Sequence, residues 1–515
     1  MSSLHPSTAG ATLTECAQVA AGQVVSDTSP DDVLVHGVTL DSRAVRPGDL
    51  YAALPGANTH GARFAASAVA AGAVAVLTDP AGRDLIATEA SDVPLIIVPE
   101  PRAVLGAVAA HVYHTGSRSA RMIGITGTNG KTTTAYLLAS ALTAMAREVG
   151  LIGTVETRIG TERIPSARTT PESCDLHRLL AVMAERGVTD CVMEVSSHAL
   201  ALHRVDGVRY DVALFTNLSQ DHLDFHADME DYFAAKASLF TPERAERGII
   251  CVDDAWGRRL ADAASVPVVT IGSEAPAGDG AAPDFTVIRA EDPGDFTLTG
   301  PDGVRLRLRS ALPGDFNIMN TAMAAATLLT LGHPAGEVQQ AVLTDPHVPG
   351  RMERVIIDAP DAPLGIVDYA HTPDAVAAAV AALRGPGVGQ LIVVLGAGGG
   401  RDVGKRAGMG RAAAGADVVI VTDDNPRGED PAAIRAAVLD GAREAATGAR
   451  VEEVAGRRDA IDRAAGIAWA AGRSAVVAVV GKGHETGQEI DGVIHPFDDR
   501  NELAAALDRH AGGHR

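Results

Sequence analysis

The stretch MIGITGTNGKTTTAYLLASAL, residues 122–142, decides the fold class. An apolar run typical of a β-strand enters a glycine-rich turn and leaves it as a helix, which is the context of a phosphate-binding loop. Gly127 and Gly130 let the backbone turn its N–H groups toward an anion. Lys131 brings a cation to the β- and γ-phosphates, and Thr132 offers a hydroxyl to Mg²⁺. We therefore predict an ATP site at this turn.

A ligand-free turn between strand and helix is the competing interpretation. The GKT triplet falls where the helix is expected to begin, which favours the phosphate site. The motif departs from the strict pattern at one place, because Ile125 stands where glycine is usual. A dehydrogenase fold is excluded, since LGAGGGR at 395–401 has Arg401 at the third glycine position of a dinucleotide motif.

Apolar runs alternate with alanine-rich stretches along the chain, which is typical of α/β folds with mostly parallel sheets. At 515 residues the chain is too long for one core, and about three domains are expected. We predict a small N-terminal α/β domain over 1–116, a central P-loop-type ATPase domain over 117–348, and a C-terminal Rossmann-like α/β domain over 349–515. The segment 273–310 is expected to be an exposed antiparallel excursion. The expected central and C-terminal strands are RMIGIT, DCVMEV, DVALFTNL, GIICVDD, GIVDYA, LIVVLGA, VVIVTDD and AVVAVVG.

The composition restricts the partners. Acidic residues outnumber basic ones by 65 to 44, so the net charge of −21 repels nucleic acids. No basic segment followed by an apolar one begins the chain, and no apolar run reaches the ~18 residues that a membrane span needs. The cysteines Cys16, Cys174, Cys191 and Cys251 show no metal-ligand spacing, so reduced and mostly buried thiols are expected. We predict a cytoplasmic monomer that binds neither nucleic acid nor membrane.

Three further side chains suggest chemistry. Glu194 ends the strand DCVMEV, where a carboxylate can reach nucleotide-bound Mg²⁺, although without the loop a solvent-facing glutamate is the plainer interpretation. His222 follows DVALFTNL in a polar loop, where histidines are usually surface residues. Lys236 is four residues from both Tyr232 and Phe240, so it shares a predicted helical face with two aromatic rings. Either its head reaches water, or desolvation lowers its pKa and leaves an amine that can take up CO₂.

The motif TGTNGKTTT is similar to that of the Mur ligase and folylpolyglutamate synthase superfamily. Further motifs look like those of the family members that add diaminopimelate, and they occur in family order from about residue 38 to about residue 500. These motifs are TLDSR (39–43), RTTPE (168–172), EVSSHAL (194–200), TNLSQDHLDFH (216–226), GDFNIMN (314–320), PGRME (349–353), DYAHTPD (368–374), DDNPRGED (423–430) and GKGHE (481–485).

The resemblance implies an ATP-dependent ligase that works in two steps. The γ-phosphate of ATP passes to the D-glutamyl side-chain carboxylate of UDP-N-acetylmuramoyl-L-alanyl-D-glutamate, and an amine of meso-2,6-diaminopimelate then attacks the acyl phosphate. Carboxylate and phosphate repel each other, so cations must neutralise both. Lys131, Mg²⁺ and Arg351 are the candidates for this role.

The resemblance also implies ligand contacts. The Mg²⁺ ligands would be Thr132, Glu194, His222 and Lys236, the last as a carbamate (N6-carboxylysine). The ATP contacts would be Gly127, Thr128, Asn129, Gly130, Lys131, Thr132, Thr133, Asn317, Asn320 and Asp368, although the last three have an alternative interpretation as turn and capping residues. The UDP-linked substrate would contact Leu40, Ser42, the loop 56–61, Thr169, Thr170, Ser196 and Arg204. Leu202 departs from the family, which often has an amide side chain there, and Arg168 is assigned no role.

The amine substrate is expected in the last domain. DDNPR follows the strand VVIVT, at the end of the sheet where open α/β domains bind ligands. Pro426 stiffens this loop, and the planar fork of Arg427 matches a carboxylate. In isolation a polar surface turn is the alternative. The resemblance implies diaminopimelate contacts at Arg401, Asp424, Asn425, Pro426, Arg427, Gly481 and Glu485.

Two kinds of alternative stay open. Within the ligase class these are a lysine-adding homologue and folylpolyglutamate synthase, and TLDSR and DNPR argue against both. From another class, the chain could be an ATP-gated binding or scaffold protein without catalysis. The presence of Lys131, Glu194, His222 and Lys236 argues against this second kind.

Overall fold

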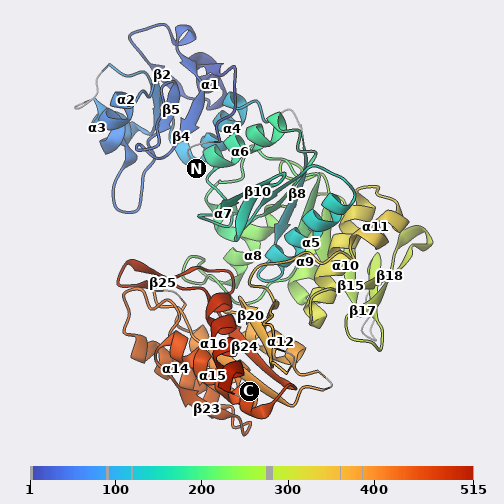
Figure 1. Cartoon of the computed structure of the whole chain (residues 1–515). Coiled ribbons are helices and arrows are strands. Elements are labelled where there is room, and N and C mark those ends of the chain that lie inside the picture. Colours follow the sequence, from blue (N-terminus) through green and yellow to red (C-terminus); the bar gives the residue numbers. More distant parts are fainter. Residues whose placement is uncertain are drawn as a thin grey trace.

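The structure is a computed structural model that describes residues 4–87, 92–116, 120–273, 282–359, 361–385, 387–400 and 402–513. Three α/β units follow one another along the chain, each built on its own main sheet (Figure 1). The expected fold class, with a small N-terminal, a large central and a C-terminal α/β unit, is confirmed. Within the described residues, no helix combines the length and apolar character required to span a bilayer.

The N-terminal unit has a five-stranded sheet in the order β2-β7-β6-β5-β4. Strands β4 to β7 are parallel, and β2 runs antiparallel to β7. Its elements are β1 (Ala11–Thr12), α1 (Leu13–Val19), β2 (Gln23–Val25), β3 (Leu34–Val35), β4 (Gly37–Thr39), β5 (Asp49–Ala52), α2 (Ala65–Ala70), β6 (Ala75–Thr78), α3 (Pro80–Ile86), β7 (Leu95–Ile97) and α4 (Pro101–Val112).

The central unit has an 11-stranded sheet in the order β11-β10-β9-β12-β8-β13-β14-β15-β16-β17-β18. The strands from β9 across to β16 are parallel, and both edges are antiparallel. The strands are β8 (Arg121–Thr126), β9 (Val149–Ile152), β10 (Glu156–Ile159), β11 (Glu162–Pro165), β12 (Asp190–Glu194), β13 (Val212–Phe215), β14 (Gly248–Cys251), β15 (Val268–Ser273), β16 (Phe285–Arg289), β17 (Asp295–Thr299) and β18 (Arg305–Arg309). The helices are α5 (Lys131–Ala144), α6 (Ser173–Glu185), α7 (Ser197–Ala201), α8 (Met229–Ala237), α9 (Ala255–Ala263), α10 (Asp315–Thr330) and α11 (Ala335–Ala341).

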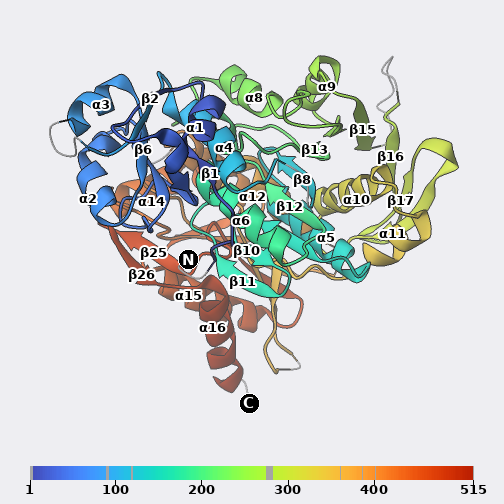
Figure 2. The same ribbon diagram turned by 90° about the horizontal axis from the view of Figure 1, so that it is seen from above.

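The segment 273–310 is only partly as expected. Strands β16, β17 and β18 are antiparallel to one another, but β16 pairs in parallel with β15. The segment therefore widens the central sheet instead of leaving it, because alternate apolar residues give its strands one face that can be buried. Figure 2 shows these strands with α10 and α11 at one edge of the molecule. Residues 274–281 lie outside the described residues.

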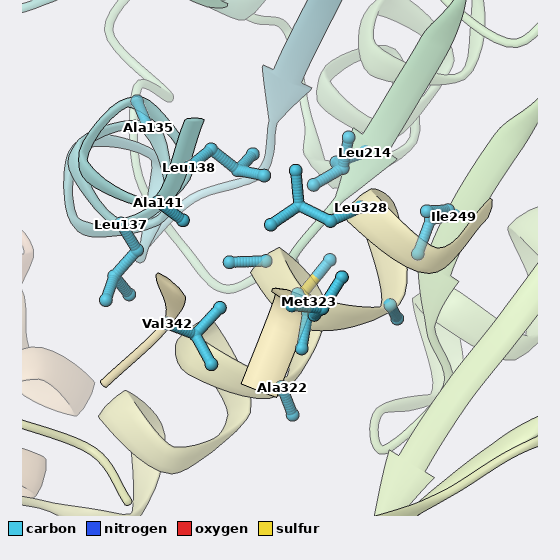
Figure 3. Close-up of a cluster of buried hydrophobic side chains, with 14 of the residues drawn as sticks. Ala135, Leu137, Leu138, Ala141, Leu214, Ile249, Ala322, Met323, Leu328 and Val342 are labelled. Atoms are coloured by element: carbon cyan, nitrogen blue, oxygen red, sulfur yellow. The ribbon is translucent and has the colours of Figure 1, made fainter. Parts of the chain in front are cut away.

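The central sheet is covered on both faces. Alternation along β8 sends Ile123 and Ile125 into the cluster under α5 and α10, and Met122 into the opposite cluster under α6 and α8. Figure 3 shows Leu138 of α5 and Met323 of α10 in the same buried cluster. Each such buried side chain contributes ~1.5–3 kcal/mol. This packing fixes the start of α10 beside the turn that precedes α5.

The C-terminal unit has a six-stranded sheet in the order β19-β20-β24-β21-β22-β23, in which only β19 is antiparallel. Its elements are β19 (Glu353–Val355), β20 (Leu364–Asp368), α12 (Pro373–Leu383), β21 (Gln390–Leu395), α13 (Lys405–Ala413), β22 (Val418–Val421), α14 (Pro431–Glu444), β23 (Arg450–Glu453), α15 (Arg457–Ala471), β24 (Ala475–Val480), the hairpin β25 (Gly487–Ile490) and β26 (Val493–Pro496), and α16 (Asp499–Gly513). The four cysteines of the chain are free and buried, as expected.

The first two units are joined where α4 packs against α6 and against the turn that follows α7. Cys174 and Ala181 of α6 belong to the hydrophobic cluster of the N-terminal unit. A Cβ at Gly106 would lie 2.2 Å from the carbonyl oxygen of Asp206, so only glycine allows this approach. The buried His177 bonds to the Asp206 carbonyl oxygen at 3.0 Å through Nε2. Thr115, which precedes the predicted boundary at 116/117 by one residue, bonds to His177 Nδ1 at 2.6 Å.

Candidate active site

The predicted phosphate loop joins β8 to α5, and its GKT triplet begins at the helix start. Gly127 has φ +143° and Gly130 has φ +87°, conformations that favour glycine. A Cβ at Gly127 would lie 1.9 Å from Thr216 Oγ1, and one at Gly130 would lie 2.6 Å from Asn320 Oδ1. The loop is therefore packed against Thr216, next to β13, and against α10. Glycine is required at both positions, because φ is positive there and because a Cβ would clash with these neighbours.

The hydroxyl of Thr132 is the point where three parts of the chain meet. It donates a hydrogen bond to Glu194 Oε2 at 2.9 Å and accepts one from Arg351 Nη2 at 3.1 Å. Arg351 precedes β19, and its guanidinium stacks on the ring of Tyr369 at 4.3 Å. A cation from the C-terminal unit thus lies against the phosphate loop of the central unit.

Glu194 is held at the end of β12, beside the phosphate loop, as its place in the sequence predicts. It is 1% exposed and pairs in register with Ile125 of β8, so the solvent-facing alternative is wrong. Its carboxylate accepts hydrogen bonds from the backbone N–H of Thr154 at 2.8 Å and from the Thr154 hydroxyl at 3.0 Å. Within the described residues, no group of three or more His, Cys, Asp or Glu side chains could hold a metal by itself.

Lys236 is buried, with 1% of its surface exposed, so the alternative in which its head reaches water is wrong. Nζ donates to the carbonyl oxygen of Gly127 at 2.9 Å and lies 4.5 Å from the ring centre of Tyr232. The expectation that Phe240 shares a helical face with Lys236 is also wrong. Helix α8 ends at Ala237, so Phe240 lies beyond it and packs against Phe215.

Both lysines of the site have lowered pKa values. Burial lowers the pKa of Lys236 well below 10.5, and the charge of Lys131 lowers it further. Burial also lowers the pKa of Lys131, whose Nζ donates to the carbonyl oxygens of Gly127 at 2.8 Å and Thr128 at 2.9 Å. No ion pair with a carboxylate holds either ammonium in the part of the chain that the structure describes. Both side chains line the cavity beside them.

His222 lies beside a buried carboxylate that connects two units. Asp221 Oδ2 lies 3.5 Å from His222 Nε2 and 3.7 Å from His371 Nε2, and Asp221 Oδ1 lies 3.7 Å from Lys405 Nζ. Burial alone would raise the pKa of Asp221, but the bond from His371 and the neighbouring positive charges lower it. Burial lowers the pKa of His222 to about 3, so the imidazole is neutral and able to bind a metal. Asp221, His371 and Lys405 are not among the predicted site residues.

Two adjoining cavities meet at the phosphate loop. The larger, of about 560 Å³, lies between the loop, the start of α10 and the end of β20. The predicted residues that line it are Asn129, Gly130, Thr133, Asn317, Asn320, Arg351 and Asp368. Asn317 and Asn320 are buried inside α10 and bond to each other at 3.1 Å, so their alternative as turn and capping residues is wrong. Asp368 accepts backbone N–H bonds from Met352 and Ala370.

The smaller cavity, of about 170 Å³, gathers residues predicted for three different ligands. Its lining includes the predicted residues Thr128, Asn129, Gly130, Lys131, Thr132, Thr133, Thr169, Glu194, Ser196, His222, Lys236 and Arg351. Thr154, Asp221, Tyr369 and His371 also line it and were not predicted. The sequence could have indicated three of them, because Asp221, Tyr369 and His371 fall inside the family-like motifs TNLSQDHLDFH and DYAHTPD.

The remaining residues predicted for the UDP-linked substrate lie on two units. Leu40 and Ser42 are half-buried in the loop after β4 of the N-terminal unit. Thr170 donates to the carbonyl oxygen of Glu194 at 2.9 Å, which places it beside the small cavity. Arg204 pairs with Glu172 at 2.9 Å. Arg102 and Arg168 pair with the same carboxylate, so this surface carries more positive than negative charge.

The DDNPR loop follows β22 at the carboxyl end of the C-terminal sheet, as predicted. Arg427 has φ +55°, and its Nε lies 3.2 Å from Glu489 Oε2 of the hairpin strand β25. Asn425 Nδ2 donates to Glu485 Oε2 at 2.9 Å. Asp424 lies beside Gly481, where a Cβ would be 2.7 Å from its Oδ2. These predicted residues and Pro426 lie together, whereas Arg401 falls outside the described residues.

Family models match the chain in three segments. "Mur ligase family, catalytic domain" matches residues 34–113, "Mur ligase middle domain" matches 125–328, and "Mur ligase, glutamate ligase domain" matches 350–483. The second and third segments begin at the phosphate loop and beside Arg351.

Relatives match nearly the whole chain. A UDP-N-acetylmuramoyl-L-alanyl-D-glutamate--2,6-diaminopimelate ligase of Streptomyces avermitilis is 50% identical over 497 residues, which is 96% of each chain. One of the same name from Corynebacterium glutamicum is 48% identical over 92% of each chain. A solved structure with that enzyme name is 31% identical, covers 97% of this chain and 99% of its own, and has a TM-score of 0.66. The folylpolyglutamate synthase of Mycobacterium tuberculosis, complexed with ADP and AMPPCP, shares only the fold at 21% identity, with a TM-score of 0.56 over 78% of this chain and 94% of its own.

Proposed function

This chain belongs to the Mur ligase family, and we propose that it is the ATP-dependent ligase that joins meso-2,6-diaminopimelate to UDP-N-acetylmuramoyl-L-alanyl-D-glutamate. The observation that carries the proposal is the position of the Thr132 hydroxyl between Glu194 and Arg351. A phosphate loop, an acid at a strand end and a cation from another unit meet there, which is what transfer of a phosphoryl group requires. The relatives named above supply the substrates.

ATP would occupy both cavities. Adenine and ribose would lie in the larger cavity, between Asn317, Asn320 and Asp368, and the phosphates would pass over Gly130 into the smaller one. The N–H groups at the start of α5 and the ammonium of Lys131 favour anions there. The buried carboxylate of Asp368 accepts two backbone bonds and retains acceptor capacity for ribose hydroxyls.

The smaller cavity also suits Mg²⁺. Its oxygen donors include the Thr132 hydroxyl and the Glu194 carboxylate, which are ligands that a hard cation prefers. Because no group of three or more His, Cys, Asp or Glu side chains among the described residues could hold a metal, phosphate oxygens and water would complete the coordination. His222 would add a neutral imidazole. Bound there, Mg²⁺ would neutralise negative charge on the phosphates.

Lys236 would act as a carbamate. Its lowered pKa makes the neutral amine available, and this amine attacks CO₂ to form an N–C bond with loss of one proton. The product is an anion in place of the amine of one of the two lysines that line the cavity. It would supply the additional metal ligand that the acidic side chains alone do not provide.

We propose a two-step reaction for this arrangement. A D-glutamyl carboxylate oxygen bonds to the γ-phosphorus, and the bond to ADP breaks. The amine nitrogen of diaminopimelate then bonds to the acyl carbon, inorganic phosphate leaves, and the nitrogen loses a proton. Lys131 and Arg351 would hold the γ-phosphoryl oxygens during the first step. Thr169, Thr170, Ser196 and Arg204 would hold the peptide part of the UDP-linked substrate, with its nucleotide end at Leu40 and Ser42.

The amine substrate would bind at the DDNPR loop. Arg427 would face the distal carboxylate, and Asp424 and Glu485 would face the distal ammonium. Each charged group at the distal end of diaminopimelate would then face a side chain of opposite charge. Lysine lacks the distal carboxylate, so bound lysine would offer Arg427 no carboxylate to pair with. The cytoplasmic location and the monomeric state remain predictions.

Phosphate release tests the proposal directly. The protein would be incubated with ATP, Mg²⁺ and the UDP-linked dipeptide, and with diaminopimelate, lysine or no amine. We expect rapid release of phosphate and a UDP-linked tripeptide only with diaminopimelate. Equal turnover with lysine would contradict the assigned amine, and no turnover with either amine would favour a binding protein without catalysis.

A further inference from the structure

A buried lysine lies directly behind the DDNPR loop. Lys482 follows β24, and its side chain has 0% exposure. Its Nζ donates to Asn425 Oδ1 at 3.1 Å, to Glu485 Oε2 at 2.9 Å and to the carbonyl oxygen of Gly487 at 2.7 Å. An ammonium has three N–H donors, so all of them are used within the protein. Lys482 therefore has no donor left for a substrate.

The lysine fixes the orientation of two predicted substrate contacts. Asn425 Oδ1 also accepts the backbone N–H of Glu489 at 3.0 Å, while its Nδ2 donates to Glu485 Oε2 at 2.9 Å. The amide cannot turn over without placing its NH₂ group against the ammonium. Glu485 Oε2 accepts from both neighbours, and we find no bond to its Oε1 within the described ranges. That oxygen remains available to a ligand.

The same network extends to the hairpin that holds Arg427. Gly487, whose carbonyl accepts from Lys482, begins β25, and Gln488 Nε2 donates to the carbonyl oxygen of Asp424 at 2.6 Å. The backbone N–H of Arg427 donates to the carbonyl oxygen of Glu489 at 3.0 Å. One buried cation thus connects the strand end after β24, the hairpin and the DDNPR loop.

We propose that Lys482 is a positioning residue for the amine substrate. By holding Asn425 and Glu485, it makes Glu485 present one carboxylate oxygen to the distal ammonium of diaminopimelate, at a fixed position relative to Arg427. The inference rests on the proposed ligase function and extends it to a residue that does not contact the substrate. Complete burial and the use of all three donors argue against direct binding of the substrate carboxylate by Lys482.

The test is the Lys482→Met variant, which keeps an unbranched apolar side chain of nearly the same length and removes the charged amine. Hydrogen bonds to charged groups are each worth ~1.5–3 kcal/mol, so we expect the KM for diaminopimelate to rise about 10- to 100-fold. The KM values for ATP and the UDP-linked dipeptide should stay within about twofold. The kcat at saturating diaminopimelate should change little, because the reacting amine is at the other end of the molecule.

Two further variants separate positioning from stability. Arg384→Met removes a cation that pairs with Asp417 elsewhere in the same unit, and it should leave all KM values unchanged. If Lys482 acts through Glu485, the double variant Lys482→Met/Glu485→Gln should be no worse than the more impaired single variant. Should the methionine variant fail to fold, Lys482→Gln, which keeps two donors, carries the same measurements.

The outcomes are distinguishable. An unchanged KM for diaminopimelate, an equal rise in the KM for ATP, or independent effects of the two substitutions would overturn the role of Lys482. If the wild-type protein forms no product with diaminopimelate, the proposed function itself fails. If the wild-type protein turns over and only the variant behaves otherwise than expected, only this inference fails.

Discussion

Lys131 and Lys236 donate hydrogen bonds to the same oxygen, the carbonyl of Gly127, at 2.8 and 2.9 Å. Two ammonium groups so close together repel each other, and the charge of Lys131 contributes to the lowered pKa of Lys236. The phosphate loop therefore makes one lysine a cation for phosphate and favours the neutral amine of the other. This difference supports distinct roles for two residues of the same type.

Replacing Lys236 by alanine should nearly abolish turnover, because the carbamate that we propose as a metal ligand is lost. Millimolar short-chain carboxylic acids should restore part of the activity by supplying an anion in the vacated space. The measurement is phosphate release as a function of acid concentration. The matched control is Lys131→Ala, which loses a cation and should gain nothing from the acids. Equal rescue of both variants, or of neither, would count against the carbamate.

Replacing Arg427 by alanine should raise the KM for diaminopimelate by about two orders of magnitude, since truncating one partner of a buried charge pair costs ~2–5 kcal/mol. The KM for ATP should remain nearly constant. In the structure Arg427 also pairs with Glu489, so the substrate carboxylate must share the guanidinium with this residue. Steady-state kinetics with each substrate varied would measure both effects.

The control for Arg427 is Arg443→Ala, on the exposed surface of α14 in the same unit, which should change neither KM. Lysine should remain a poor substrate for Arg427→Ala, because removing a mismatch creates no new attraction. A variant that used diaminopimelate as well as the wild type would show that the distal carboxylate is recognised elsewhere.

The contact of Asp221 with Lys405 and His371 links the central and C-terminal units. Because the predicted contacts are spread over three units, we expect compaction when an ATP analogue and the UDP-linked dipeptide bind. Small-angle scattering should show a smaller radius of gyration at saturation. Lys405→Ala should weaken the link, reduce the compaction and lower kcat/KM by about tenfold, or ~1.4 kcal/mol. An unchanged radius of gyration in the wild-type protein would refute closure.

His177 should make the stability depend on pH. Burial lowers its pKa from 6.5 to about 4, so the folded protein favours the neutral ring. The stabilisation is fully present above pH 6.5 and is lost as the pH falls toward 4, because the unfolded chain takes up the proton first. Between pH 7 and pH 5 the loss is about 2 kcal/mol. Urea unfolding at both pH values should show a smaller decrease for His177→Gln than for the wild type, and equal decreases would exclude this role.

Local patterns were sufficient for the fold class and for the placement of several motifs. The phosphate loop could be predicted because glycine conformation and the change from strand to helix are set by neighbouring residues. For the same reason Glu194 and the DDNPR loop could be placed at strand ends. The expected face of α8 is wrong, because spacing alone does not tell where a helix ends and Phe240 lies beyond this one.

Tertiary structure alone decided which distant side chains share a site. Thr132 and Arg351 meet only because the C-terminal unit packs against the phosphate loop, and Lys236 is buried only because α8 covers that loop. Lys482 gives no signal of its own in the sequence, since its three partners are fixed by how a strand end, a loop and a hairpin converge. The sequence therefore determined the local conformations, whereas burial and charge pairing, which set the pKa values and the free donors, depend on contacts between residues far apart in the chain.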